Sequence, residues 1–444
     1  MGIFLFIVFI LGYTLITVEH FIKIDKLIPS LLMMVICWTI ISLNLGSITN
    51  WLDISTSKII PLNSWELSEK SKLLQETLLH HFGKTSEILI FLMGAMVIVE
   101  IIEHFDGFSA IKRAIKTKRK VIILWVIAVL TFFLSAIIDN LTATIVVITI
   151  TRKLIPNSQD RMWYAGLIII AANSGGAWSP IGDVTTTMLW IAGKISSVKV
   201  MSLLIFPSLV SMLVPLTIAS FLPAFKGVIT AAEETQPARK NATLILVVGL
   251  LLIVFVPLFK AITHLPPYIG MMFSLAIFAT IAEIISLRSF TLTYGRDENE
   301  APNSPTLKAI KQIEMTSILF FLGILMTVAA LESVGMIYNF GRSVNASLPQ
   351  EVFILLLGIS SAIFDNVPLV AASISMFSDS PDNVVWHLIA YAAGTGGSLL
   401  IIGSAAGVVA MGMEKIPFGW YLKKIGPLAL LGYLAGLGVL LLIK

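Results

Sequence analysis

The sequence predicts an all-α membrane protein of about ten transmembrane helices and two re-entrant hairpins, arranged as a five-plus-five inverted repeat with discontinuous helices. Three observations lead to this fold class. The 444 residues are 57% apolar and 13% charged, with a mean hydropathy of +0.93, which is too apolar for soluble domains. Apolar runs of spanning length recur along the chain. Two further apolar stretches are each interrupted by an Asp-Asn pair, and their surrounding sequences are nearly identical.

Ten apolar runs have roughly the 17 to 25 residues that a helix needs to cross the hydrocarbon core. They lie near 2–18, 27–45, 87–105, 163–192, 201–222, 241–257, 268–287, 316–338, 385–412 and 425–443. The run 2–18 lacks the basic start and small-residue cleavage site of a signal peptide, so we expect it to be the first span. Residues 63–66 resemble a capping box and precede leucines at helical spacing, which predicts a connecting helix on the outer surface.

The stretches 121–150 and 351–377 differ from these runs because an ionisable pair lies near the middle of each. We interpret both as re-entrant hairpins that return to the side they left. With this topology, the loops on one face carry 21 Lys and Arg and the opposite face carries nine. The positive-inside rule then makes the first face cytoplasmic and places both termini outside. Basic residues flank the first hairpin and acidic residues follow the second, so the two hairpins enter from opposite faces.

An internal repeat supports this topology. The sequence SAIIDN at 135–140 recurs as SAIFDN at 361–366, and AANSGG at 171–176 recurs as AAGTGG at 392–397. The motifs follow the same order in both halves, whereas the hairpins open to opposite faces, so the repeat is expected to be inverted. Inverted repeats are typical of secondary transporters, whose substrate site lies near the midplane of the membrane.

The repeat also predicts the organisation of the chain. Residues 1–225 form the first repeat, 226–240 form a cytoplasmic linker, and 241–444 form the second repeat. The polar, proline-containing segment 289–313 is predicted to be another linker. The basic segment 111–120 is predicted to be an interfacial helix that lies against anionic lipid.

Helix breaks are expected where glycine and proline interrupt a crossing. The segment 173–183, NSGGAWSPIGD, carries three glycines and a proline inside the run 163–192, which makes a continuous helix there improbable. The segment 395–404 is the corresponding break in the run 385–412. Half-helix ends expose carbonyl groups that coordinate cations, and Asn, Ser and Thr side chains add neutral oxygens.

Three carboxylates, those of Asp139, Asp183 and Asp365, are expected at membrane depth. An acid at the centre of a span costs about 2.5–3.5 kcal/mol, so each one indicates a functional site. A second interpretation is that Asp139 and Asp365 only cap the returning helix of their hairpins and that Asp183 is an N-cap. The hydroxyls of Thr185 and Thr186 are either cation ligands or donors to their own helix backbone.

Other functional classes find little support in the sequence. The net charge is only +4 and the basic residues are scattered, which argues against nucleic acid as a partner. The single cysteine, Cys37, excludes an intrachain disulfide and a cysteine-based metal cage. No nucleophile-and-base arrangement, phosphate loop or nucleotide fingerprint is present. We therefore expect no enzymatic activity and no cofactor, and a membrane enzyme or a passive channel is the alternative of a different class.

At these motifs the chain resembles the ion transporter superfamily and, within it, the NhaD-type sodium/proton antiporters. The matching sequences are SAIIDNLTAT from residue 135, NSGGAWSPIGDVTTT from 173, SAIFDNVP from 361 and GTGGSLLIIGSAAG from 394. The resemblance implies exchange of cytoplasmic Na⁺ or Li⁺ for external H⁺ across a bacterial inner membrane, for sodium and pH homeostasis. It also implies a homodimer, with lipid, monovalent cations and protons as the partners.

The resemblance implies a set of ion-binding and proton-coupling residues, which are Ser135, Asp139, Asn140, Asn173, Asp183, Thr185, Thr186, Ser361, Asp365, Asn366, Thr395 and Ser398. The Na⁺ itself is expected at the two hairpin tips, on Asp139, Asn140, Asp365 and Asn366. The two halves are not equivalent, because Gly394 stands where the first break has Asn173 and Ser404 stands where it has Asp183.

An alternative within the same superfamily is a Na⁺-coupled or anion transporter that carries a dicarboxylate or an oxyanion. Dicarboxylate carriers have Ser-Asn-Thr motifs at their hairpin tips, whereas this chain has Asp-Asn at both. Carboxylates at the tips suit a cation and a proton better than an anionic substrate, because like charges repel.

Overall fold

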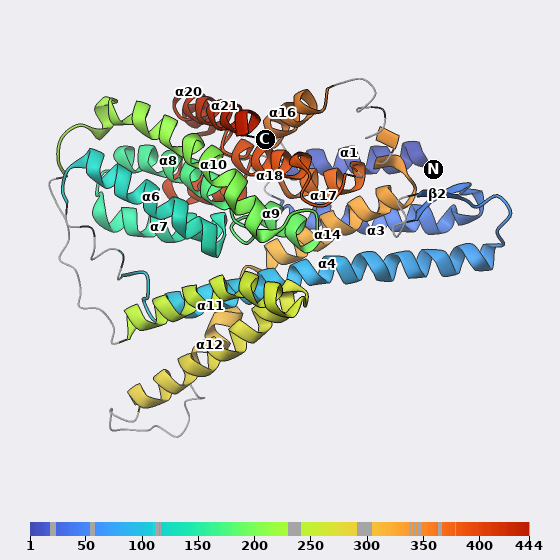
Figure 1. The fold of residues 1–444 in the computed structure, drawn as a ribbon, viewed down its shortest axis with the longest axis horizontal. Coiled ribbons are helices and arrows are strands. Elements are labelled where there is room, and N and C mark those ends of the chain that lie inside the picture. The colour runs from blue at the N-terminus through green and yellow to red at the C-terminus, as the bar shows by residue number, and fades with distance from the viewer. Residues whose placement is uncertain are drawn as a thin grey trace.

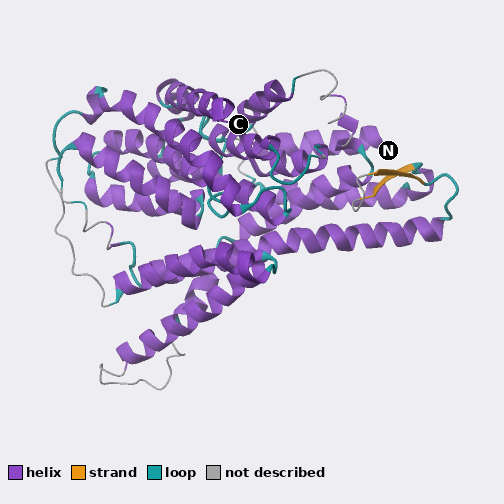
Figure 2. Ribbon diagram, in the orientation of Figure 1, coloured by secondary structure: helices purple, strands orange, loops and turns teal. Residues whose placement is uncertain are grey.

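The computed structural model describes residues 1–17, 24–53, 58–109, 111, 115, 117–229, 241–290, 304–337, 339–340, 343, 349–362, 366–377 and 379–443. Within these ranges the chain is almost entirely helical, with eighteen α-helices, two short 3₁₀ turns and one two-stranded sheet (Figures 1 and 2). Most of the helices run along the long axis of the molecule, α11 overlaps the left part of α4 in this view, and α12 diverges below it (Figure 1).

Among the described residues, seven helices are long and apolar enough to cross a membrane. They are α4 (Leu67–His104), α6 (Lys120–Ile138), α10 (Ser197–Ser220), α11 (Ala242–Thr263), α12 (Pro267–Phe290), α14 (Met315–Ser333) and α21 (Gly426–Ile443). The helices α1 (Gly2–Thr17) and α3 (Leu27–Leu43) are apolar and slightly shorter. The long-range packing pairs α3 with α14, α4 with α12, and α10 with α21. Each pair joins a helix of the first half to a helix of the second half.

Helix α4 differs from the sequence prediction. It is one helix of 38 residues, about 57 Å long at 1.5 Å per residue, and not a surface helix followed by a separate span at 87–105. No proline interrupts it, and its glycines are individually too weak to end a helix. Its capping box lies at Glu66 and Glu69, later than the predicted start at Asn63, and the Glu66 backbone N–H donates to Glu69 Oε2 at 3.0 Å.

Two elements lie in segments where the sequence predicts only connections. The strands β1 (Asn50–Asp53) and β2 (Lys58–Pro61) pair antiparallel beside the start of α4. The helix α13 (Pro305–Gln312) lies inside the predicted linker 289–313, where Ser304 accepts the Leu307 N–H as its N-cap. A proline at the first helical position and a serine before it favour helix initiation. The linker 226–240 lies mostly outside the described residues. Of the interfacial helix predicted at 111–120, residues 111, 115 and 117–120 are described, and 115 and 117–119 are not helical, so the prediction is wrong for this part of the segment.

Two helix pairs occupy the predicted hairpins. Helices α6 and α7 (Asn140–Leu154) pack together and meet at Asp139, whose φ of 74° ends α6. Helices α16 (Gln350–Ser360) and α17 (Asn366–Met376) form the second pair.

Two crossings are discontinuous. Helix α8 (Ser158–Gly176) ends before α9 (Val184–Ile191), and α18 (Val384–Gly396) ends before α19 (Ala405–Glu414). Helix α20 (Phe418–Lys424) then leads to α21. Each hairpin packs on both halves, because α6 contacts α8 while α7 contacts α19, and α16 contacts α18 while α17 contacts α9.

Matched hydrogen bonds fasten each hairpin to its own discontinuous crossing. Ser135 Oγ donates to the Ala172 carbonyl at 2.6 Å, and Ser361 Oγ donates to the Ala393 carbonyl at 2.8 Å. These serines occupy the same position of the repeated motif, and so do the two alanines. The two halves therefore repeat in their contacts as well as in their sequence.

An ionic cluster lies at the end of the first hairpin that is far from Asp139. The buried Glu414, at the end of α19, accepts from Arg152 Nε at 2.6 Å and from Arg161 Nε at 2.8 Å. Arg152 lies near the end of α7 and Arg161 near the start of α8. Since removing one partner of a buried ion pair leaves an uncompensated charge, this cluster ties the first hairpin to the second half.

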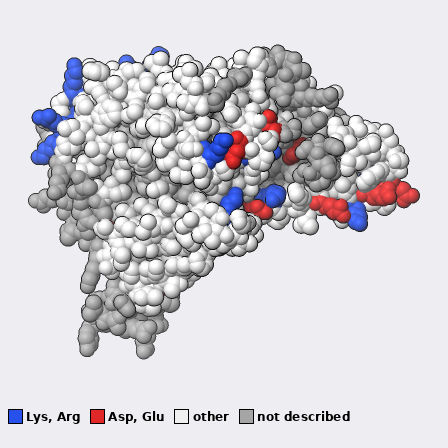
Figure 3. All heavy atoms as spheres, in the orientation of Figure 1, with Lys and Arg blue, Asp and Glu red and all other residues white. Residues whose placement is uncertain are grey.

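Charged side chains are distributed unevenly over the surface. In the view of Figure 3, Lys and Arg gather at the left edge, whereas Asp and Glu gather at the right end, where Figure 1 shows the start of α4. A smaller group of mixed charges lies in the middle of this view, and the area between it and the basic left edge carries few charges, as expected of a surface in contact with hydrocarbon.

Close backbone contacts at the two breaks yield a prediction about Gly182 and Gly403. A Cβ at Gly182 would lie 2.7 Å from the Ser135 carbonyl oxygen, and one at Gly403 would lie 2.7 Å from the Ala362 carbonyl oxygen. We expect Gly182→Ala and Gly403→Ala each to lower the free energy of unfolding by about 1–3 kcal/mol. The measurement is the melting temperature of the protein in detergent.

Gly83→Ala is the matched control, because a Cβ at this position on α4 meets no atom within 4 Å. It is expected to raise stability by about 0.5–1 kcal/mol through the lower entropy of the unfolded chain. Equal melting temperatures for Gly182→Ala and Gly83→Ala would contradict the close packing of the first break on α6.

Candidate functional site

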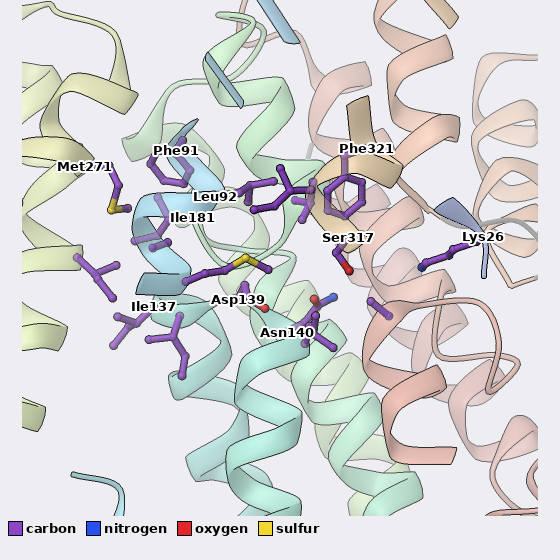
Figure 4. A pocket seen from close by; sticks show the side chains of 18 residues that line it. Lys26, Phe91, Leu92, Ile137, Asp139, Asn140, Ile181, Met271, Ser317 and Phe321 are labelled. Atoms are coloured by element: carbon purple, nitrogen blue, oxygen red, sulfur yellow. The ribbon is translucent and has the colours of Figure 1, made fainter. Parts of the chain in front are cut away.

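Asp139 lies at the tip of the first hairpin and caps the helix that follows it. Its Oδ1 accepts the Thr142 backbone N–H at 2.9 Å, and its Oδ2 accepts the Thr142 hydroxyl at 2.8 Å. The capping role considered in the sequence analysis is therefore present. Asp139 and Asn140 also line a cavity of about 40 Å³, which is space for two or three waters. Figure 4 shows both side chains in this cavity, with apolar side chains such as Phe91, Leu92 and Ile137 around it.

Asn140, the first residue of α7, connects the hairpin tip to the first break. Its Nδ2 donates to Asn173 Oδ1 at 3.0 Å and to Asp183 Oδ2 at 2.9 Å. Asn366, the first residue of α17, donates to the same Asp183 oxygen at 3.4 Å. Both hairpins thus place an amide against one carboxylate.

Asn173 extends the same network into the second break. Its Nδ2 donates to Ser398 Oγ at 3.0 Å and to Ser404 Oγ at 2.9 Å. The polar cluster, as we call it, comprises Asn140, Asn173, Asp183, Asn366, Ser398 and Ser404, and no member is more than 5% exposed. The polar cluster brings the two hairpins and the two helix breaks together at one buried point. Its hydrogen bonds from Asn173 to the second break join residues that are more than 200 positions apart in the sequence.

Asp183 and its neighbours show how local helix capping and the polar cluster share residues. Asp183 is the N-cap of α9 and accepts the Thr185 N–H on Oδ1 at 3.0 Å, while Oδ2 faces the two amides. Thr186 Oγ1 donates to the Asp183 carbonyl at 2.9 Å, so its hydroxyl is used within the helix. Thr185 Oγ1 is buried and makes no hydrogen bond among the described residues. A buried hydroxyl of this kind is a candidate ligand for a group absent from the structure.

The remaining predicted residues support the framework or lie outside the described part. Ser135 and Ser361 hold their hairpins to α8 and α18, as described above. Thr395 Oγ1 donates to the Tyr391 carbonyl of its own helix at 2.5 Å. Asp365 lies outside the described residues, so its predicted contribution to a Na⁺ site stays a prediction.

The structure adds residues that the sequence analysis did not select. Thr142 holds the Asp139 carboxylate, and the N-cap rule identifies it, because it lies three residues after the cap. Thr144, two residues further along α7, has a buried hydroxyl with no hydrogen bond among the described residues. Lys26 and Ser317 line the Asp139 cavity from α3 and α14. No local sequence signal indicates these two, because only the tertiary fold brings them to the hairpin tip.

Comparison with known proteins identifies the family. The sequence profile of the citrate transporter family, CitMHS, matches residues 6–388. An Arabidopsis thaliana protein named sodium/proton antiporter 2 is 38% identical over 443 residues, which covers 97% of both chains. The Na⁺/H⁺ antiporter NhaD of Vibrio cholerae is 30% identical over 99% of this chain and 91% of its own length. The chain belongs to the NhaD-type sodium/proton antiporter family.

One further relative agrees with this assignment, and a solved structure shares the fold. Sodium/proton antiporter 1 of Arabidopsis thaliana is 44% identical over 372 residues, and the matched region spans 82% of this chain but 62% of that relative. The crystal structure of the Alcanivorax borkumensis YdaH transporter superposes with a TM-score of 0.57 at 12% identity, over 93% of this chain and 97% of the other. The NhaD-type resemblance that the motifs predicted is confirmed, and the chain is an integral multi-pass membrane protein.

The bonds of Asn140 yield a prediction that needs no transport assay. Asn140→Asp replaces the amide that donates to Asp183 Oδ2 by a second carboxylate at the same position. We expect the free energy of unfolding to fall by about 2–3 kcal/mol at pH 8, because a hydrogen bond to a charged group is lost and two like charges face each other. The loss should shrink towards pH 5, because a proton on either carboxyl restores a donor between them.

The measurement is the difference in melting temperature between variant and wild type from pH 5 to pH 9. Asn157→Asp is the control, because Asn157 is an exposed N-cap of α8 and aspartate caps equally well. A pH-independent loss in Asn140→Asp would show that Asn140 and Asp183 are not in electrostatic contact.

Proposed function

We propose that this protein exchanges cytoplasmic Na⁺ or Li⁺ for external H⁺ by alternating access across a bacterial inner membrane, for sodium and pH homeostasis. The observation that carries the proposal is the polar cluster, where one carboxylate, three amides and two hydroxyls meet inside an apolar helical protein. Relatives that align over nearly the whole chain are named Na⁺/H⁺ antiporters, and these names support the choice of ions.

The chemistry of the proposal is competition between a metal ion and protons for carboxylate oxygen. A partly dehydrated Na⁺ takes oxygen ligands from carboxylates, amide carbonyls and hydroxyls, as hard cations do. Asn140 and Asn173 supply such oxygens when their amides rotate, and Asp139 and Asp183 supply the charge. A proton on either carboxyl removes that charge and so weakens cation binding. Na⁺ and H⁺ therefore exclude each other from the same carboxylates. A site that releases Na⁺ on one side of the membrane and takes up H⁺ there returns with the proton, and this couples the two movements. Asp365, with Asn366, is the corresponding pair of the second tip in this proposal.

Alternating access is supported by the matched contacts of the two halves. Ser135 and Ser361 make the same bond, and Gly182 and Gly403 each pack closely on a backbone carbonyl of the hairpin in their own half. In this proposal the two halves have opposite orientations, so that they reach two equivalent arrangements, one open to each face. The basic edge seen in Figure 3 supports a cytoplasmic assignment of that face. An external placement of both termini is part of the proposal. We extend the proposal to a homodimer by analogy with the family.

A Na⁺-coupled or anion transporter of the same superfamily is the second candidate. The match to the citrate transporter profile favours it, and Lys26 in the wall of the Asp139 cavity offers a positive charge to an anion. The carboxylates of Asp139 and Asp183 oppose it, because both would repel a dicarboxylate from the polar cluster.

The test is proton movement in sealed vesicles that contain the purified protein and a pH-sensitive dye. Addition of Na⁺ or Li⁺ between pH 7 and pH 9 is expected to move protons, and addition of K⁺ or choline is the comparison. Asp139→Asn is expected to abolish the signal while the protein stays folded, since asparagine still accepts from Thr142 but cannot take up a proton or hold a cation by charge.

Asp160→Asn serves as the matched control, because Asp160 pairs with Lys120 at 2.6 Å near the start of α8, away from the polar cluster. Near-wild-type exchange in Asp139→Asn would contradict the proposal that Asp139, at the first hairpin tip, binds the cation and the proton. A folded wild type that moves no protons with any monovalent cation would favour the anion transporter, and dicarboxylates and oxyanions would then be tried.

A further inference from the structure

The described helices pack in two groups, and each group takes helices from both halves of the chain. The frame group, as we call it, comprises α1, α3, α4 and α11 to α14, in which α3 packs on α14 while α4 and α11 pack on α12. The site group comprises α6 to α10 and α16 to α21, in which α6 packs on α8, α10 on α21 and α16 on α18. The polar cluster and both hairpins lie in the site group. Between the groups, α4 packs on α9, α6 on α11 and α14 on α17.

The cavity at Asp139 lies on the boundary between the two groups. Asp139, Asn140 and Ile181 line it from the site group, and Phe91 and Phe321 line it from the frame group. Figure 4 shows the two phenylalanines across the cavity from Asp139 and Asn140. Because no residue of the polar cluster is more than 5% exposed, an ion reaches the cluster from water only when the surrounding helices move. The boundary, where a cavity already separates the groups, is the place for such a movement.

One residue of the site group, Trp190, is held by two helices of the frame group. Lys260 Nζ, in the last turn of α11, donates to the Trp190 carbonyl at 2.9 Å and lies 4.3 Å from the centre of the Trp190 ring. Phe91 of α4 meets the same ring edge to face, and the two ring centres are 6.3 Å apart. Both distances suit the attraction of a cation or a ring edge to an aromatic face. We call Phe91, Trp190 and Lys260 the Trp190 clamp.

The clamp is connected to the polar cluster by one short helix. Trp190 lies at the end of α9, and Asp183 is the N-cap at its start. The eight residues of α9 span about 12 Å at 1.5 Å per residue. The Lys260 ammonium is at the end of α9 where the helix dipole favours a cation, and the Asp183 carboxylate is at the end where it favours an anion. While the clamp is closed, α9 and the carboxylate that caps it are held against α4 and α11.

The clamp can open without leaving the Trp190 carbonyl unpaired. This carbonyl also accepts the Gly193 N–H at 3.2 Å, so it keeps a hydrogen bond when Lys260 moves away. Lys260 is half-buried, and its long flexible side chain lets the ammonium reach water. The contact therefore favours one arrangement of the two groups and still opens reversibly.

We propose that the Trp190 clamp is a state-dependent contact, closed in the arrangement that the structure shows and opened in each transport cycle as the site group moves along the frame group. The proposal rests on the exchange function proposed above and deepens it, because it names a contact that alternating access has to break. Neither Lys260 nor Trp190 lines the Asp139 cavity, so the clamp acts on the movement of the helices and not as a ligand of the ion.

The first test ties the clamp shut. Cys37, the single cysteine of the chain, is replaced by alanine, and Lys260→Cys and Trp190→Cys are introduced together. The two thiols are then joined by a short bifunctional maleimide. Proton movement in vesicles is expected to persist before the treatment and to fall about ten-fold or more after it, because a closed clamp stops the conformational step. Undiminished proton movement in the cross-linked protein overturns the proposal.

Lys120→Cys with Asp160→Cys is the matched control pair. Lys120 Nζ and Asp160 Oδ2 are 2.6 Å apart, and they belong to α6 and α8, which are both in the site group. This cross-link spans no boundary, so proton movement is expected to stay within about two-fold of the untreated protein. An equal loss in the two cross-linked pairs overturns the proposal, because the loss would then not depend on movement between the groups.

A second measurement needs no transport. Ser317→Cys in the Cys37→Ala background places a thiol at the boundary, because Ser317 is buried on α14 and lines the Asp139 cavity. Its reaction with a water-soluble maleimide in detergent is expected to be about three-fold faster or more with Lys260→Met, since local opening exposes the thiol. Lys260→Arg keeps a donor for Trp190 and is expected to leave the rate unchanged, as is Lys311→Met on the exposed face of α13. Equal rates in Lys260→Met and Lys260→Arg overturn the proposal.

The thiol reaction also separates the clamp from the proposed function. A wild type that moves no protons with any cation rejects the proposed exchange, whereas a faster thiol reaction in Lys260→Met still supports a clamp between the two groups. If the double-cysteine protein does not reconstitute, the thiol reaction decides the proposal by itself.

Discussion

The side chain of Asn173 is the contact on which the arrangement of the two halves depends. Its carbonyl oxygen accepts from Asn140 of the first hairpin, and its amide nitrogen donates to Ser398 and Ser404 of the second break. A buried polar side chain that loses its partners is costly, so the hydrogen bonds of Asn173 favour this arrangement of the first hairpin and the two breaks. In a protein surrounded by lipid, apolar burial does not select one packing over another. Directional bonds at the polar cluster supply that selection.

Broken helices create the second constraint, because each break leaves backbone N–H groups and carbonyls without helical partners. Asp183 accepts the Thr185 N–H at the start of α9, and Ser404 accepts the Gly407 N–H at the start of α19. The same two caps also receive hydrogen bonds from Asn140 and Asn173. Each cap therefore serves local helix formation and long-range assembly together, and the breaks occur where hairpin tips are available to satisfy them.

The repeated motifs predicted the centre of the structure well, because repetition and helix-breaking residues are properties of the sequence itself. Asn140, Asn173 and Asp183 were selected on those grounds, and they are in contact. The continuity of α4 and the strand pair before it were missed, because no strong breaker or alternation marks either one. Lys26 and Ser317 were also missed, because a residue that reaches a site from a distant helix carries no local pattern.

The difference between the two breaks explains how nearly symmetric halves produce one asymmetric site. Ser404 replaces Asp183 in the second break, yet it keeps the N-cap because a hydroxyl oxygen accepts a backbone N–H as a carboxylate does. What it does not keep is the negative charge. The amides of Asn140 and Asn366, one from each hairpin, therefore both turn to the single carboxylate of Asp183. A second acid in place of Ser404 would sit beside Asn173 in the same buried cluster, where two carboxylates repel and one takes up a proton. The polar cluster therefore holds one carboxylate that is shared by two hairpins, and serine at the second break preserves the helix without adding another carboxylate.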